Sequence, residues 1–118
     1  MSDAADQIPF EVIATRTLDV NGKPAFHLRI GRPVLEADGE TWRCDYAVEG
    51  PNTNHRSSFC GVDAVQALLN VIYVLSVEAE MSEENLSERL SWGGQRKHFG
   101  LPSPEADPER TQSALDGA

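Results

Sequence analysis

The chain has 118 residues, of which 40% are hydrophobic and 25% charged, so it is long enough for one globular domain with its own core. Ten basic against nineteen acidic side chains give a formal net charge of −9, which argues against a nucleic-acid-binding protein and against docking on an anionic membrane. Two cysteines are too few for a disulfide scaffold. The N-terminus lacks the features of a secretory signal, and no uninterrupted apolar run is long enough for a membrane helix, so we expect a cytoplasmic protein.

The N-terminal part of the chain predicts a β-hairpin. Residues 10–20 are rich in β-branched side chains and free of glycine and proline, which is typical of a strand. Asn21-Gly22 follows, and this pair favours a tight type I′ turn because both of its central residues need positive φ. The return strand is predicted over residues 25–30, and Pro33 ends it because proline cannot donate to a sheet ladder.

A second pair of strands is predicted beyond a turn at Asp38-Gly39. Residues 40–49 alternate between apolar and polar side chains, with Trp42 and Cys44 beginning the apolar side, which is typical of a half-buried antiparallel strand. Residues 50–54 predict a loop, and residues 55–60 predict the strand that returns. These strands and the hairpin together predict a four-stranded meander.

After Gly61 the hydrophobic period changes from two residues to 3.6, which predicts a helix. Asp63 and Gln66 have the spacing of a capping box at its start. The apolar residues from Val62 to Ala79 cover about 220° of the helical wheel, well beyond the usual stripe of somewhat over 100°. One sheet face is too narrow to cover that surface, so either the C-terminal segment or a second subunit is expected to pack on the helix.

The end of the helix is acidic. The side chains that we expect to meet a protein partner with a basic surface are Glu78, Glu80, Glu83, Glu84 and Glu88. Complementary charge steers such encounters, and the alternative interpretation is a solvated helix end without a partner. Beyond this run, residues 90–92 predict a short extended piece before Gly93-Gly94, and a loop follows with Phe99 and Leu101 as its anchors.

The predicted organisation is a flexible N-terminus over residues 1–8, a single domain over residues 9–102 and a disordered acidic tail over residues 103–118. The domain is expected to be α+β, a four-stranded antiparallel sheet packed on one long helix in the order β-β-β-β-α with a short extended C-terminal segment. Its predicted core consists of Phe26, Leu28, Trp42, Tyr46, Phe59, Leu68, Leu69, Ile72 and Trp92.

Several segments resemble a family of small uncharacterised bacterial domains: RTLDVNGKP, RIGRP, ETWRCDYAVEG, GVDAVQALLNVIYVL, LSWGG and FGLP. That family has a hairpin, a Trp-x-Cys strand, a helix that starts Gly-Val-Asp-x-x-Gln-Ala-Leu, and a late Trp-Gly followed by Phe-Gly-x-Pro. The resemblance covers residues 15–102 and implies the fold. It implies no activity.

Cys44, His55 and Cys60 are the only cluster of soft metal ligands, and they lack the close pair of a zinc site, so we expect no metal and no cofactor. Both cysteines are predicted to be free thiols, unless the strand register places them opposite each other. Cys60 comes just before the predicted helix, so the enzymatic alternative is a Cys60 thiolate with His55 or His27 as its base.

Basic residues offer a further alternative. The glycines before Arg96 and Lys97 lack the spacing of a phosphate-binding loop, and anion binding by these two side chains is the alternative to a turn at the two glycines. Cross-strand pairing with Asp45 and Glu49 is expected for the arginines of the solvent-facing side of the sheet. These arginines are Arg29, Arg32, Arg43 and Arg56.

No catalytic signature occurs in the chain, so the sequence favours a non-enzymatic acidic protein-interaction module. An immunity or inhibitor protein that masks a basic partner, such as a nuclease-like or nucleic-acid-binding protein, fits its size and its charge of −9. The alternative is a homo-oligomeric structural or scaffold domain that dimerises through the wide apolar surface of the helix. A third alternative is a small-ligand-binding protein or a cysteine-dependent enzyme.

Overall fold

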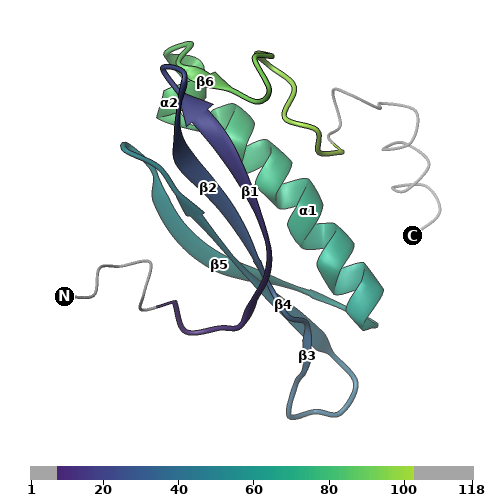
Figure 1. The fold of residues 1–118 in the computed structure, drawn as a ribbon. Helices are drawn as coiled ribbons and strands as arrows, with labels where there is room; N and C mark the ends of the chain where they lie inside the picture. The colour runs from purple at the N-terminus through teal and green to yellow at the C-terminus, as the bar shows by residue number, and fades with distance from the viewer. Residues whose placement is uncertain (1–7, 103–118) are drawn as a thin grey trace.

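The computed structural model describes residues 8–102, and these residues form one antiparallel sheet with one long helix against it (Figure 1). The predicted α+β class is confirmed. The expected acidic tail and, apart from Ile8, the expected flexible N-terminus lie outside the described residues. The elements are β1 (Val12–Val20), β2 (Lys23–Gly31), β3 (Val34–Leu35), β4 (Trp42–Glu49), β5 (Asn54–Gly61), α1 (Ala64–Met81), α2 (Glu83–Leu86) and β6 (Leu90–Ser91).

The four long strands are antiparallel neighbours in chain order, β1-β2-β4-β5, so the predicted meander is present. The strand count of four is too low, because two short strands extend the sheet to six. β3 pairs with the start of β4, and β6 pairs with the end of β1. Each is two residues long, so neither is long enough to show an alternating pattern in the sequence.

The first hairpin forms at the predicted turn. Asn21 and Gly22 have φ angles of 54° and 80°, as a type I′ turn requires, and Val20 pairs with Lys23 across it. β1 begins at Val12 rather than at Phe10, because the Phe10 ring folds over the sheet at Gly31. A Cβ atom at Gly31 would lie 2.6 Å from that ring, so this close approach requires glycine.

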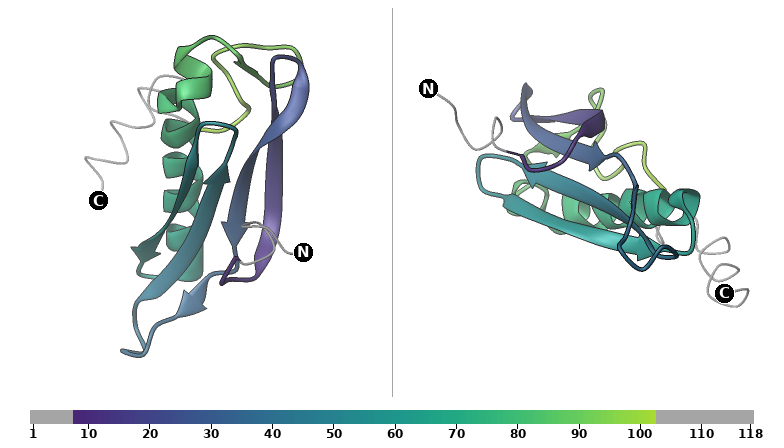
Figure 2. Two further views of the ribbon diagram at one scale, coloured as in Figure 1. Left: turned by 90° about the vertical axis from the view of Figure 1, so that its left-hand side faces the viewer. Right: turned by 90° about the horizontal axis from the view of Figure 1, so that it is seen from below.

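α1 lies on one face of the sheet and runs along β4 and β5, as the two views of Figure 2 show. Its start is capped as predicted: the Asp63 carboxylate accepts a hydrogen bond from the Gln66 backbone N–H at 2.7 Å. In return, the Gln66 side-chain oxygen accepts one from the Val62 backbone N–H at 2.7 Å. A Cβ atom at Gly61 would lie 2.5 Å from the Ala67 backbone nitrogen, so glycine lets the helix start directly against β5.

The core lies between the sheet, α1 and the C-terminal segment. Its buried members are Leu18, Val20, Phe26, Leu28, Cys44, Tyr46, Val48, Ala67, Val71, Leu75, Ala79, Leu90 and Phe99. Of the predicted core, Phe26, Leu28 and Tyr46 are confirmed, while Trp42, Leu68 and Ile72 are only half-buried. The predicted anchors of the C-terminal loop are also confirmed, because Phe99 is buried and Leu101 packs against the core.

Three residues of the predicted core are exposed, and for these the prediction is wrong. Phe59 lies on β5, which pairs with β4 alone and forms an edge of the sheet. Trp92 lies at a surface turn, where it stacks on Arg16. Leu69 is 44% exposed because α1 turns its smaller residues, among them Ala67, toward the sheet.

Candidate interaction surface

The fold buries some of the five glutamates of the expected acidic surface and exposes others, and Glu84 is the most buried of them. This side chain is fully buried, and its carboxylate accepts hydrogen bonds from the Asn52 backbone N–H at 2.7 Å and from the Thr53 hydroxyl at 2.6 Å. Burial of a carboxylate is costly unless such donors satisfy it, so Glu84 holds the β4–β5 loop against α2. It is therefore unavailable to a partner, and its assignment to a docking surface is corrected.

Glu78 is also used within the domain. It accepts a hydrogen bond from the Tyr46 hydroxyl at 3.3 Å, and its carboxylate lies 3.3 Å from the His55 ring nitrogen Nε2. Burial, followed by the charge of Glu78, raises the pKa of Tyr46, so this hydroxyl stays a proton donor. Glu78 therefore ties α1 to β4 and β5.

The remaining acidic side chains are scattered. Glu83 and Glu88 are exposed, Glu80 is half-buried, and Glu88 lies 3.4 Å from an Arg96 guanidinium nitrogen. Residues 8–102 hold 13 acidic and nine basic side chains, a net charge of −4, so the other −5 of the chain lies outside them. The acidic run therefore does not form one continuous surface on the described part of the chain.

Arg96 serves as a bridge within the C-terminal part of the domain. Its guanidinium donates to the Leu90 carbonyl at 3.1 Å and to the Asn85 carbonyl at 3.4 Å, in addition to its contact with Glu88. Lys97 is exposed beside it. These three contacts hold Arg96 within the domain, so they compete with an anion site built by Arg96 and Lys97.

The two cysteines are free and differ in their surroundings. Cys44 pairs with Phe59 and Cys60 pairs with Arg43, so the register does not place the thiols opposite each other. Cys44 is buried and donates to the Gly31 carbonyl at 3.3 Å. Burial, together with the charge of Asp45, raises the pKa of the Cys44 thiol to about 11, so this thiol stays protonated at neutral pH.

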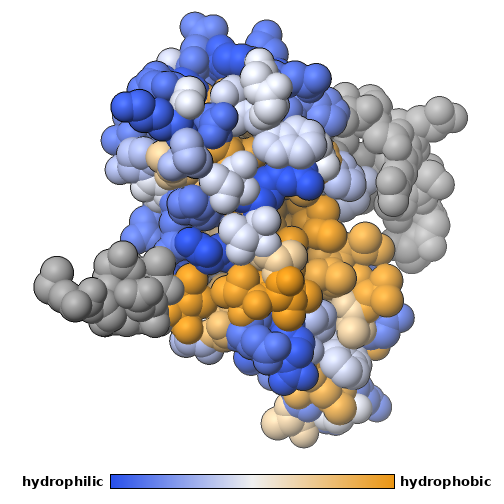
Figure 3. All heavy atoms as spheres, viewed as in Figure 1, coloured by the Kyte–Doolittle hydropathy of each residue, from blue (hydrophilic) through white to orange (hydrophobic). Residues whose placement is uncertain are grey.

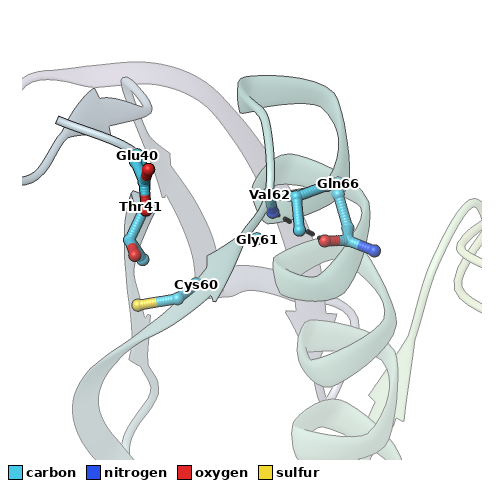
Figure 4. A pocket seen from close by; sticks show the side chains of 6 residues that line it. All are labelled: Glu40, Thr41, Cys60, Gly61, Val62 and Gln66. Atoms are coloured by element: carbon cyan, nitrogen blue, oxygen red, sulfur yellow. Dashed lines mark hydrogen bonds between the residues drawn. The ribbon is translucent and has the colours of Figure 1, made fainter.

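Cys60 is exposed beside the start of α1 and lines a solvent-open hollow of about 470 Å³ with Glu40, Thr41 and Gln66 (Figure 4). His55 lies on the same strand, five residues or about 16 Å away, and on the opposite face of the sheet. His27 lies on β2, which β4 separates from β5, and it contacts Thr17. The structure therefore does not bring Cys60 together with the bases that the sequence suggested.

The open face of the sheet carries paired charges. Arg29 contacts Glu49 across β2 and β4, as expected from the sequence. Arg43 lies 3.3 Å from Asp45, but both residues are on β4, so this contact is not the expected cross-strand pair. Arg32 pairs with Glu11 at the sheet edge. Within residues 8–102, no group of three or more His, Cys, Asp or Glu side chains is arranged to hold a metal ion.

The largest unexplained feature is the side of α1 that faces away from the sheet. Every fourth residue of the helix forms an apolar row along this side, which we call the outer ridge: Val65, Leu69, Tyr73, Val77 and Met81. All except the half-buried Tyr73 are exposed, with Val65 at 64% and Met81 at 65%. No charged residue occurs from residue 64 to residue 77. Solvent-facing helix surfaces in monomers are normally charged or polar, so the outer ridge is a candidate interaction surface.

The space-filling view agrees with this composition. Figure 3 shows apolar side chains in a band across the middle of the view and over the first part of α1, while the upper part is mostly polar. By length and composition alone, α1 is also long and apolar enough to cross a membrane, a property that it shares with core helices of soluble proteins. One side of α1 packs along β4 and β5, and five of its 18 residues are buried.

The C-terminal segment, residues 92–102, packs against β1 and not against the outer ridge of α1. The Arg16 guanidinium lies 4.3 Å from the centre of the Trp92 ring and donates to the Phe99 carbonyl at 2.7 Å. Gly100 has a φ of 74°, and a Cβ atom there would lie 2.4 Å from the Trp92 ring. Trp92, Phe99 and Gly100 therefore serve packing, and this segment leaves the outer ridge uncovered.

Sequence reasoning found the excess apolar surface of α1 but assigned Leu69 to the wrong side. A usable signal was present: Ala67, Val71, Leu75 and Ala79 form a second row at four-residue spacing and include two of the three alanines of the helix. Small side chains let a helix approach a sheet closely, so they mark the inner side.

The chain belongs to the family described as a domain of unknown function (DUF6968), whose model matches residues 14–103. The match covers every element from β1 to β6 except the first residues of β1. No curated protein and no solved structure shows significant similarity to the chain.

Proposed function

We propose that this domain is a non-enzymatic protein-interaction module that binds its partner through the outer ridge of α1. The observation that carries the proposal is the exposure of Val65, Leu69, Val77 and Met81 on a helix that has no charged residue over residues 64–77. Exposed apolar rows of this kind are expensive in water and are typical of surfaces that become buried in a complex.

The other sites offer less. The Cys60 thiol has neither His55 nor His27 within reach, and Arg96 already donates to two backbone carbonyls of the domain. The acidic run offers Glu83 and Glu88 as its fully exposed carboxylates, because Glu84 is buried and Glu78 bonds within the domain. The outer ridge is the larger continuous surface, and it therefore supports an interaction role better than the acidic run does.

The test is a capture experiment with matched variants of the full-length chain in its native cells. We expect the wild type to retain a stoichiometric protein partner, or a second copy of itself, and Leu69→Glu to lose it. A Glu83→Lys Glu88→Lys double variant is the control, because it reverses the exposed part of the acidic run and leaves the outer ridge intact. Retention by Leu69→Glu together with loss by the double variant would contradict the proposal.

A second candidate is the acidic immunity or inhibitor module that masks a basic partner. The supporting observation is the exposure of Glu83 and Glu88 on a chain with a net charge of −9. Such a partner would associate much faster at low salt, because screening weakens attraction between exposed charges. An association rate that does not change between low and high salt would count against this candidate and leave the outer ridge as the docking surface.

A further inference from the structure

We infer that the partner that covers the outer ridge is a second copy of this chain, in a symmetric dimer in which the two α1 helices cross. This inference rests on the proposed function, because it names the occupant of the same surface. It is carried by the charge of the chain, by the spacing of the ridge residues and by the composition of the chain outside residues 8–102.

Charge is the first argument. Each copy carries a net charge of −9, so most ways of bringing two copies together oppose acidic surfaces. The outer ridge is the exception from Val65 to Val77, because residues 64–77 contain no charged side chain. The polar residues that accompany the ridge in this stretch, Gln66 and Asn70, are neutral. Two copies can therefore meet along α1 without like charges facing each other.

The spacing of the ridge is the second argument. A row at every fourth residue is the ridge that packs into the matching groove of another helix, and two such rows interdigitate with helix axes crossing at about −50°. The part of the outer ridge that lies within the uncharged stretch, from Val65 to Val77, has its middle between Leu69 and Tyr73. A two-fold axis through that point brings each ridge onto its own copy, which is the self-complementary contact of a symmetric dimer.

Other occupants fit less well. Residues 103–118 of the same chain contain Leu115 as their only large aliphatic side chain, so they offer little apolar surface to cover four exposed ridge residues. An anionic membrane would be repelled by the negative charge of the chain.

The dimer is expected to be weak. A single helix face is smaller than the roughly 800 Å² per partner that stable interfaces bury, so we expect a dissociation constant in the micromolar range.

The experiment measures the mass of the purified full-length chain by light scattering from submicromolar to high micromolar concentration. We expect the wild type to rise from 12.9 kDa toward twice that mass. Leu69→Glu and Leu69→Lys should each remain monomeric, because each places two like charges beside the two-fold axis, and the dissociation constant should rise at least about 100-fold. An equimolar mixture of the two variants should dimerise again, because opposite charges then meet.

Each other outcome overturns the inference in a distinguishable way. A wild type that stays monomeric over the whole range means that the outer ridge has a different occupant; if Leu69→Glu still loses a captured protein from cells, the proposed function survives. A dimer that persists in both single variants means that the copies join elsewhere, for example along the free edge of β1. Circular dichroism of the variants excludes unfolding as the cause of monomer formation, since Leu69 is 44% exposed.

Discussion

The two sides of α1 are both apolar, yet one packs against the sheet and the other faces solvent. The inner side presents Ala67, Val71, Leu75 and Ala79, all essentially fully buried against the sheet. The outer ridge presents larger side chains on average, such as Leu69 and Met81, to solvent. The comparison teaches that the hydrophobic pattern of a helix reports how much surface needs a partner, whereas side-chain size reports which side is closest to the sheet.

The largest expected difference between the two sides of α1 comes from truncating one leucine on each side to alanine. Leu75→Ala removes a side chain that is 1% exposed, so it should lower the free energy of unfolding by about 2–5 kcal/mol. Leu69→Ala should lower it by less than about 1 kcal/mol, because that side chain is already in solvent in the monomer. Urea denaturation at submicromolar protein concentration measures both without a contribution from self-association. Equal losses would show that the two sides are not distinct.

The same contrast between buried and exposed neighbours divides the acidic run. Glu84→Ala leaves the Asn52 backbone N–H and the Thr53 hydroxyl without their acceptor, so it should cost about 1–3 kcal/mol of stability. Glu83→Ala at the adjacent exposed position is the matched control and should be nearly neutral. Thermal unfolding of both variants measures these costs. If Glu84→Ala left the stability unchanged, the Glu84 carboxylate would be exposed to solvent rather than buried.

A smaller effect is expected where α1 begins. Asp63→Ala removes the acceptor for the Gln66 backbone N–H and should cost about 1 kcal/mol, whereas Asp63→Asn keeps an acceptor and should cost less. Because the cap supports both sides of the helix, Asp63→Ala should weaken folding without altering the ratio of dimer to folded monomer. Chemical denaturation and light scattering on the same samples separate the two effects.

The smallest effect is expected where Arg16 contacts Trp92 and Phe99, a contact that we call the C-terminal clasp. Trp92→Leu removes the ring beneath the Arg16 guanidinium and should cost about 0.5–1 kcal/mol, because this contact is partly exposed. Dimerisation should be unaffected, since the clasp lies apart from the outer ridge. A Trp92→Leu chain that is folded but no longer dimerises would place the clasp in the interface and contradict the division between the two regions.

The local parts of the fold were predictable from the sequence, and the non-local parts were not. The Asn21-Gly22 turn and the Asp63–Gln66 cap depend on residues a few positions apart, so their spacing predicts them. The partners of Glu84 lie on a loop more than 30 residues earlier in the chain, and no short-range pattern indicates such a contact. The register that separates Cys44 from Cys60 depends in the same way on how two strands align.

The sequence predicted that α1 has an excess apolar surface but not which residues form it. The width of the apolar sector indicated that α1 has a second partner, but the sequence alone placed Leu69 in the core and treated the acidic run as the docking surface. The error at Leu69 has a simple cause: a helical wheel shows which residues share a side and does not show where the sheet lies. The burial of Ala67 and Ala79 supplies that missing direction.

The most direct test of the outer ridge as the contact between copies is a cysteine cross-link. In a Cys60→Ser background the remaining Cys44 thiol is buried, so Leu69→Cys introduces one reactive thiol on the ridge, and Thr15→Cys introduces one on exposed β1 as the control. Mild oxidation at micromolar concentration should convert Leu69→Cys into a covalent dimer, because residues beside a two-fold axis meet their own copies at disulfide distance. A covalent dimer with Thr15→Cys and none with Leu69→Cys would move the interface to the edge of the sheet.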